Sequence, residues 1–186
     1  MASSVAAGFL IAMGCIVNLK VGGIAGAALF SAGLWYVVNY DAELFTGRVT
    51  HERYDIWKKL LMLAGNLIGA CACGILAGVA LPDIHEAAAG ITAGYSDVLT
   101  VLWKSVMCGI CMYLATTKKE NRLPHVIYGV MLFILSGYAH SIAVAGYAAI
   151  ARQIAWWVIP LAAAGNAAGS YLMKWLLGSS RLMPSS

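Results

Sequence analysis

The stretch AGNLIG, residues 64–69, places an asparagine inside a long apolar segment, and AGNAAG, residues 164–169, does so again later in the chain. The two glycines of each stretch lie one helical turn apart, so a neighbouring helix can approach closely at that face. An amide in apolar surroundings costs several kcal/mol unless it is hydrogen-bonded. Asn66 and Asn166 therefore each require a polar partner.

The composition around these stretches is typical of a membrane protein. Of the 186 residues, 61% are hydrophobic and only 11% are charged, and the mean hydropathy is +0.79. A globular domain has about a quarter of its residues charged. We therefore expect an integral membrane protein whose surroundings are a lipid bilayer. The net charge of +4 is small and scattered, which argues against a nucleic-acid partner.

The apolar runs predict six transmembrane helices in an all-α membrane protein. Each crossing needs roughly 20 residues, and the runs lie near residues 4–19, 24–45, 56–81, 98–117, 124–150 and 153–178. We expect them to form a single transmembrane domain, residues 1–186.

The two asparagine stretches predict an internal repeat. Each ends a group of three spans, about residues 1–82 and about residues 96–180. Because three is an odd number, the second group must cross the membrane in the opposite direction to the first. Inverted repeats of this kind are common in channels and transporters, and they place the permeation site near the bilayer midplane.

Each repeat also contains a segment that is unfavourable for a continuous helix. NYDAELFTG, residues 39–47, ends the second span, and SGYAHSIAVAG, residues 136–146, interrupts the fifth. Opened backbone at membrane depth is tolerated where protein surrounds it. We expect broken second and fifth helices whose opened backbone is hydrogen-bonded by Asn66 and Asn166. In the alternative interpretation, these asparagines only join neighbouring helices. We further expect Asp41 and Glu43 to cap the short helix after the first break.

The charged residues predict the orientation. The connection between spans three and four is acidic, whereas the other long connections and the tail are basic: Arg48, Arg53, Lys58, Lys59, Lys118, Lys119, Arg122, Lys174 and Arg181. Basic segments stay in the cytoplasm. Both termini are therefore expected to be cytoplasmic, in a multi-pass protein of a bacterial inner membrane.

Several segments, taken in order, resemble the formate/nitrite transporter family. AELFTG at 42–47 is similar to that family's loop in the second span, and SGYAHSIA at 136–143 is similar to its break in the fifth. GNLIG and GNAAG match its paired elements, and KSVMCGICMYLA at 104–115 resembles its fourth span. The resemblance implies an aquaporin-like fold, a homopentamer with one pore per protomer, and transport of formate, nitrite, hydrosulfide, acetate or similar small monovalent anions.

Matching positions imply roles for individual residues. Thr46 and His140 correspond to a central polar pair, Leu34 and Phe133 to a cytoplasmic constriction, and Phe45 to an outer constriction; Asn166 lies near the histidine. The chain departs from the family at three polar positions, which are occupied by Ala139, Val144 and Gly109. These departures leave the solute and any proton coupling open.

The residues themselves suggest how an anion could pass. Histidine has an ordinary pKa of about 6.5, so His140 could donate a proton or a hydrogen bond to an arriving anion; alternatively, its ring stabilises the broken backbone. Lys104 and Lys20, near the outer ends of spans, could attract anions to the pore, or could extend to the lipid headgroups.

Two other functions remain open. The CGIC sequence at 108–111 raises the possibility of a membrane thiol enzyme, but activation of a thiol needs an exposed, electropositive position, and these cysteines lie deep in an apolar run. A neutral-solute or water channel on the same fold is the other alternative. We expect no enzymatic activity, no cofactor and no metal.

Overall fold

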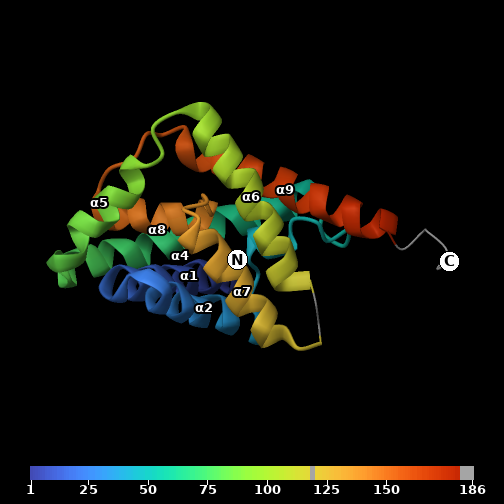
Figure 1. The fold of residues 1–186 in the computed structure, drawn as a ribbon, viewed down its shortest axis with the longest axis horizontal. Helices are drawn as coiled ribbons and strands as arrows, with labels where there is room; N and C mark the ends of the chain where they lie inside the picture. Colours follow the sequence, from blue (N-terminus) through green and yellow to red (C-terminus); the bar gives the residue numbers. More distant parts are fainter. Residues whose placement is uncertain (118–119, 181–186) are drawn as a thin grey trace.

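The computed structural model describes residues 1–117 and 120–180. Lys118, Lys119 and Arg181, which contributed to the predicted orientation, lie outside these ranges. The described residues form helices joined by loops, without strands (Figure 1). The elements are α1 (Ala2–Val21), α2 (Gly23–Asn39), α3 (Phe45–Arg48), α4 (Ile56–Ala80), the 3-10 helix η1 (Pro82–Ile84), α5 (His85–Ala93), α6 (Val98–Thr117), α7 (Arg122–Leu135), α8 (Ser141–Ala151) and α9 (Val158–Ser180).

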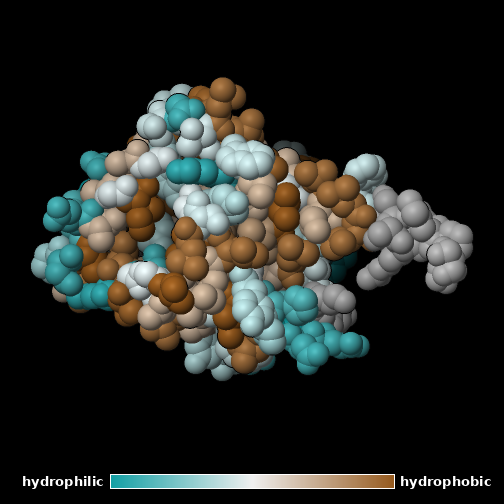
Figure 2. Space-filling view, in the orientation of Figure 1, coloured by the Kyte–Doolittle hydropathy of each residue, from teal (hydrophilic) through white to brown (hydrophobic). Residues whose placement is uncertain are grey.

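The surface is consistent with a membrane protein. Three helices, α1, α4 and α6, are long and apolar enough to cross a membrane. Figure 2 shows apolar residues over the middle of the molecule and polar residues gathered towards its two ends. Trp57, Trp103 and Trp156 are all largely exposed, as is common for tryptophans at a membrane interface.

Two helix pairs pack closely through the glycines of the repeated stretches. α1 packs against α4, and α6 packs against α9. A Cβ atom at Gly69 would lie 1.9 Å from the carbonyl oxygen of Val5, and one at Gly169 would lie 1.9 Å from that of Val106. The glycines are therefore required for backbone contact, which confirms the expected close approach.

The second and fifth apolar runs are both interrupted, as expected from the sequence. α2 ends at Asn39, and the chain turns through residues 40–44 before the short helix α3. α7 ends at Leu135, and residues 136–140 separate it from α8. Both breaks use the left-handed backbone region, at Asp41 (φ 53°) and Gly137 (φ 65°).

The capping prediction for Asp41 and Glu43 is wrong. The N-cap residue of α3 is Leu44, and no side chain caps this helix. Instead, Asp41 pairs with Arg48 and Glu43 pairs with Lys58. A four-residue helix has too small a dipole to compete with a nearby guanidinium or ammonium group.

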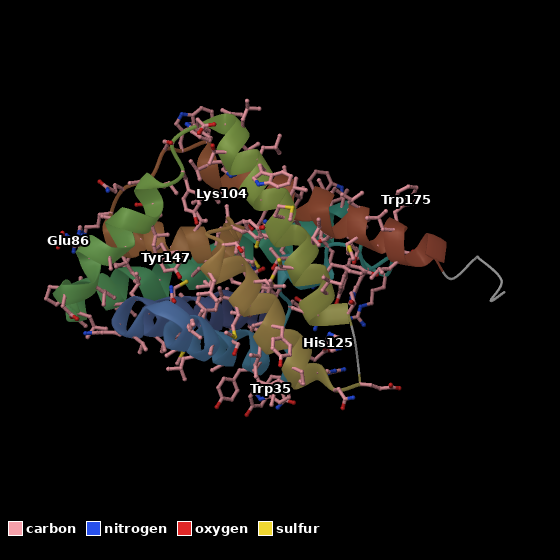
Figure 3. All side chains as sticks on the ribbon, in the orientation of Figure 1. Trp35, Glu86, Lys104, His125, Tyr147 and Trp175 are labelled. Carbon is pink, nitrogen blue, oxygen red and sulfur yellow. The ribbon has the colours of Figure 1, made fainter. Side chains whose placement is uncertain are left out.

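The two ends of the bundle differ in charge. We call one the basic end; it carries the segment 40–55, Arg122 and Lys174, which surround a common cavity. The opposite end carries η1 and α5, with Asp83 and Glu86 (Figure 3).

Candidate functional site

Asn66, on α4, holds the first opened segment. Its Oδ1 accepts a hydrogen bond from the backbone N–H of Phe45 at 2.7 Å, and its Nδ2 donates to the carbonyl of Glu43 at 2.8 Å. The same Nδ2 also donates to the carbonyl of Ser4 on α1, at 2.7 Å. The side chain is fully buried. One amide thus satisfies the opened backbone and joins two helices at once.

Asn166, on α9, makes the equivalent set of bonds in the second half. Its Oδ1 accepts from the N–H of Ser141 at 2.8 Å, and its Nδ2 donates to the carbonyls of Ala139 (2.8 Å) and Ser105 (2.9 Å). This side chain is also fully buried. The expectation that both asparagines hydrogen-bond opened backbone is confirmed, and so is their role in joining helices.

The breaks bring Thr46 and His140 together across 94 positions of sequence. The Thr46 Oγ1 and His140 Nε2 atoms are 2.8 Å apart, and each residue is only 1% exposed. Thr46 lies in the first turn of α3, and His140 is the N-cap residue of α8. The two short helices therefore begin at the same place, with their polar side chains in contact.

The second ring nitrogen determines the tautomer of His140. The backbone N–H of Ala143 donates to Nδ1 at 3.1 Å, so Nδ1 carries a lone pair. In the neutral ring the proton then lies on Nε2, which donates to Thr46. Thr46 is left with its own hydroxyl proton, for which the described part of the chain provides no acceptor. A solute beside this pair would therefore meet a hydroxyl donor.

Apolar side chains enclose the pair. The ring of Phe133 stacks on that of His140, with centroids 5.4 Å apart, and Phe30 meets Phe133 edge-on at 5.5 Å. Leu34 is fully buried in the same cluster. Phe30 was not predicted from the sequence, although it lies one helical turn before Leu34, and this spacing could have indicated it.

Phe45 lies in a different cluster. Its side chain packs with Val49, Met62 and Ala163, whereas Leu34 and Phe133 belong to the cluster around α1, α2 and α7. The structure thus joins Thr46, His140 and Phe133 by direct contacts and places Leu34 in the same buried cluster as Phe133. Phe45 packs in another cluster.

The two lysines predicted to attract anions differ in their surroundings. Lys20 forms an ion pair with Asp83. Lys104 donates to the carbonyl of Gly94 at 3.1 Å and lies over the ring of Tyr95, 5.4 Å from its centroid; Figure 3 shows it in the first half of α6. Among the residues that the structure describes, Lys104 forms no ion pair, although the pKa of Asp97 is lowered by hydrogen bonds and, to a smaller extent, by the charge of Lys104. This charge is therefore better placed than that of Lys20 to act on a solute.

A cavity of about 700 Å³ opens at the basic end. Leu44 and Gly47, on either side of Thr46 in sequence, line it together with cationic side chains: Arg48, Arg53, Arg122 and Lys174. These cations were interpreted from the sequence only as signals of orientation. Their convergence on one cavity could not be predicted, because they come from three separate parts of the chain: residues 48–53, the start of α7, and α9.

The described residues hold no cluster of three metal-ligating side chains. All five cysteines are free thiols in apolar helices, and Cys108 and Cys111 of the CGIC sequence are buried in α6. This arrangement lacks the exposed position that a reactive thiol needs.

Comparison of the sequence with protein-family models, and with curated proteins, finds no match. Comparison with solved structures finds a pentameric formate channel with formate bound, at a TM-score of 0.78 and 17% identity, covering 97% of this chain and 95% of that one. It also finds an FNT family ion channel, at a TM-score of 0.76 and 22% identity, covering 98% of this chain and 89% of that one. At these identities the likeness establishes the fold: the chain has the fold of these channels over nearly its whole length.

Proposed function

We propose that the chain is a membrane channel for small monovalent anions of weak acids, of the formate, nitrite, hydrosulfide or acetate class. The observation that carries the proposal is the buried Thr46–His140 hydrogen bond between the starts of α3 and α8. An intramembrane ionisable residue is by default a functional one, and this one stands at the junction of two breaks. The fold of the two solved channels supports the same conclusion.

The proposed architecture is an inverted repeat of six spans, about residues 1–82 and about residues 96–180. Its support is the equivalence of the hydrogen bonds of Asn66 and Asn166. In this arrangement α2 with α3 forms the broken second span, and α7 with α8 the broken fifth. The basic end faces the cytoplasm of a bacterial inner membrane, with both chain termini inside. We propose a homopentamer, by analogy with the pentameric neighbour.

Energetics favour passage of the solute in its protonated form. A bare anion in dry hydrocarbon costs tens of kcal/mol. Protonating a carboxylic acid with a pKa near 4 at pH 7 costs only about 4 kcal/mol. The neutral acid would therefore pass the apolar side chains of Phe30, Leu34 and Phe133 more easily than the anion.

We infer that His140 acts by hydrogen bonding in its resting state. Loss of a proton from the neutral ring would leave an imidazolate, which is too basic to form here. To serve as a proton donor, the ring must first gain a proton on Nδ1 and lose the bond from Ala143. Proton donation by His140 thus requires a rearrangement of the first turn of α8, whereas hydrogen-bond donation through Thr46 does not.

A second candidate function is a channel for a neutral small solute or water. It is favoured by the uncharged form of the Thr46–His140 pair and by Ala139, which leaves no carboxylate next to the histidine. A pore of this kind would also pass an undissociated acid.

Reconstituted vesicles separate the two candidates. We expect vesicles containing the protein to take up formate, nitrite, hydrosulfide or acetate faster than empty vesicles, and to show an anion reversal potential or coupled proton uptake. Rapid swelling in an uncharged solute such as glycerol, with no uptake of any of the four anions, would establish the neutral-solute function instead.

A further inference from the structure

The cavity at the basic end is much larger than a small weak acid requires. Its volume is about 700 Å³, within the range of roughly 300–1,000 Å³ found for pockets that hold drug-sized ligands. Two polar residues, Thr50 and Thr116, also line it. The cavity therefore has room for a solute of many atoms together with polar groups to bind it.

Two of its cations are matched by carboxylates and two are not. Arg48 pairs with Asp41 and Lys174 pairs with Glu52, at 2.6 and 2.7 Å. Both carboxylates are more than four-fifths exposed, at 84% and 87%, so water screens their charges, whereas the Arg48 side chain is only 10% exposed. Within residues 1–117 and 120–180, neither Arg53 nor Arg122 has a carboxylate partner.

His51, which also lines the cavity, reports an excess of positive charge there. Its pKa is lowered from 6.5, first by partial burial and then by the nearby charges of Arg53, Arg48 and Lys174, while Asp41 opposes them. The ring stacks on Tyr54, which Arg53 covers at 4.7 Å from the ring centroid. Cations therefore outnumber carboxylates around the imidazole, as they do in the cavity lining as a whole, where Asp41 and Glu52 face four cationic side chains.

We propose that this cavity is a cytoplasmic binding site for a multiply charged oxyanion of the phosphate class, which blocks the route when bound. An arginine guanidinium group can donate two parallel hydrogen bonds to two phosphate oxygens, and its electrostatic attraction for the ligand grows with the charge of the ligand. Leu44 and Gly47 place such a ligand next to Thr46. A polyanion cannot continue past the buried pair, because its charges would have to be desolvated. Binding of the oxyanion in the cavity does not depend on the proposed function. Its blocking of solute passage does rest on the proposed channel function.

Binding is tested on the full chain in detergent with inorganic pyrophosphate as the probe. We expect calorimetric binding of pyrophosphate, none of formate at equal concentration, and roughly tenfold weaker binding in Arg122→Gln. Lys59→Gln is the matched control, because Lys59 lies at the same end but contacts Tyr171 outside the cavity. Absent binding, or equal weakening by the two variants, would overturn the proposal.

Two further measurements locate the ligand and its effect. Bound pyrophosphate should raise the pKa of His51, measured by nuclear magnetic resonance, since an added anion favours the imidazolium. If pyrophosphate binds and the titration midpoint of His51 does not change, the binding site lies elsewhere. In excised patches, pyrophosphate applied to the cytoplasmic face should reduce the current, whereas pyrophosphate applied to the other face should leave it unchanged. If the protein transports no solute at all, the proposed function fails, while the calorimetric result still decides whether the binding site exists. Inhibition of the current by pyrophosphate from both faces would contradict a cytoplasmic site.

Discussion

Glu43 and Ala139 occupy equivalent positions in the two breaks: the carbonyl of each accepts a hydrogen bond from a buried asparagine Nδ2 at 2.8 Å. Their side chains make the two halves electrically different. Glu43 pairs with Lys58 at 3.0 Å, whereas Ala139 provides no charge near Lys104, whose backbone carbonyl accepts from the Ala139 N–H. The charge at one break is therefore neutralised by an ion pair, and the other break lies next to a lysine that forms no ion pair among the described residues.

This asymmetry predicts that Lys104 increases the local concentration of anions. Lys104→Gln should lower anion flux severalfold at low ionic strength, and the difference should shrink at high salt, where the Debye length falls to about 3 Å. Flux into reconstituted vesicles over a series of salt concentrations measures this effect. Lys20→Gln is the control, with a smaller effect because Asp83 already neutralises Lys20. A loss of flux that is independent of salt would contradict an electrostatic role.

His140→Phe should reduce transport to the level of empty vesicles while the oligomer stays intact. The variant keeps the ring stacked near Phe133 but removes the Nε2 donor to Thr46 and the Nδ1 acceptor for Ala143. Because loss of a cap alone costs about 1 kcal/mol, His140→Asn serves as the comparison: it can still cap α8. Flux at the wild-type rate in either variant would remove the imidazole from the mechanism.

Asn166→Leu should destabilise the protein strongly. It removes the bonds of the Ser141 N–H and the Ala139 carbonyl in the opened segment, at about 1–3 kcal/mol for each buried group, and also the bond to the Ser105 carbonyl of α6. Thermal unfolding in detergent measures the loss, and Asn66→Leu should cause a similar one, because it breaks the equivalent bonds. Melting curves like that of the wild type would show that these amides do not hold the opened backbone.

Gly69→Ala and Gly169→Ala should each separate a helix pair. The added methyl group would lie 1.9 Å from a backbone oxygen of α1 or α6, so the helices must move apart, at a cost of about 3 kcal/mol or more. Gly90→Ala is the matched control, because a Cβ atom at Gly90 meets no atom within 4 Å and alanine favours the helix. The unfolding temperature should fall for the first two variants only; equal shifts for all three would contradict the close packing.

The sequence by itself determined the elements that depend on local composition. Low charge and long apolar runs predicted the membrane helices, and NYDAELFTG and SGYAHSIAVAG predicted where two of them are interrupted. The repeated glycines and asparagines predicted helix contacts and amide-bonded backbone, because an amide buried among apolar residues must find a partner. The resemblance in these segments also predicted the fold that the solved channels share.

Only the tertiary structure decided which distant side chains meet. The Thr46–His140 contact, the Nε2 tautomer set by Ala143 and the separate position of Phe45 all depend on how α3 and α8 are oriented. The convergence of basic residues on one cavity depends on it as well. Hydropathy and residue spacing describe one segment at a time, whereas these contacts join segments whose relative placement is set by the backbone packing of four helices at Gly69 and Gly169.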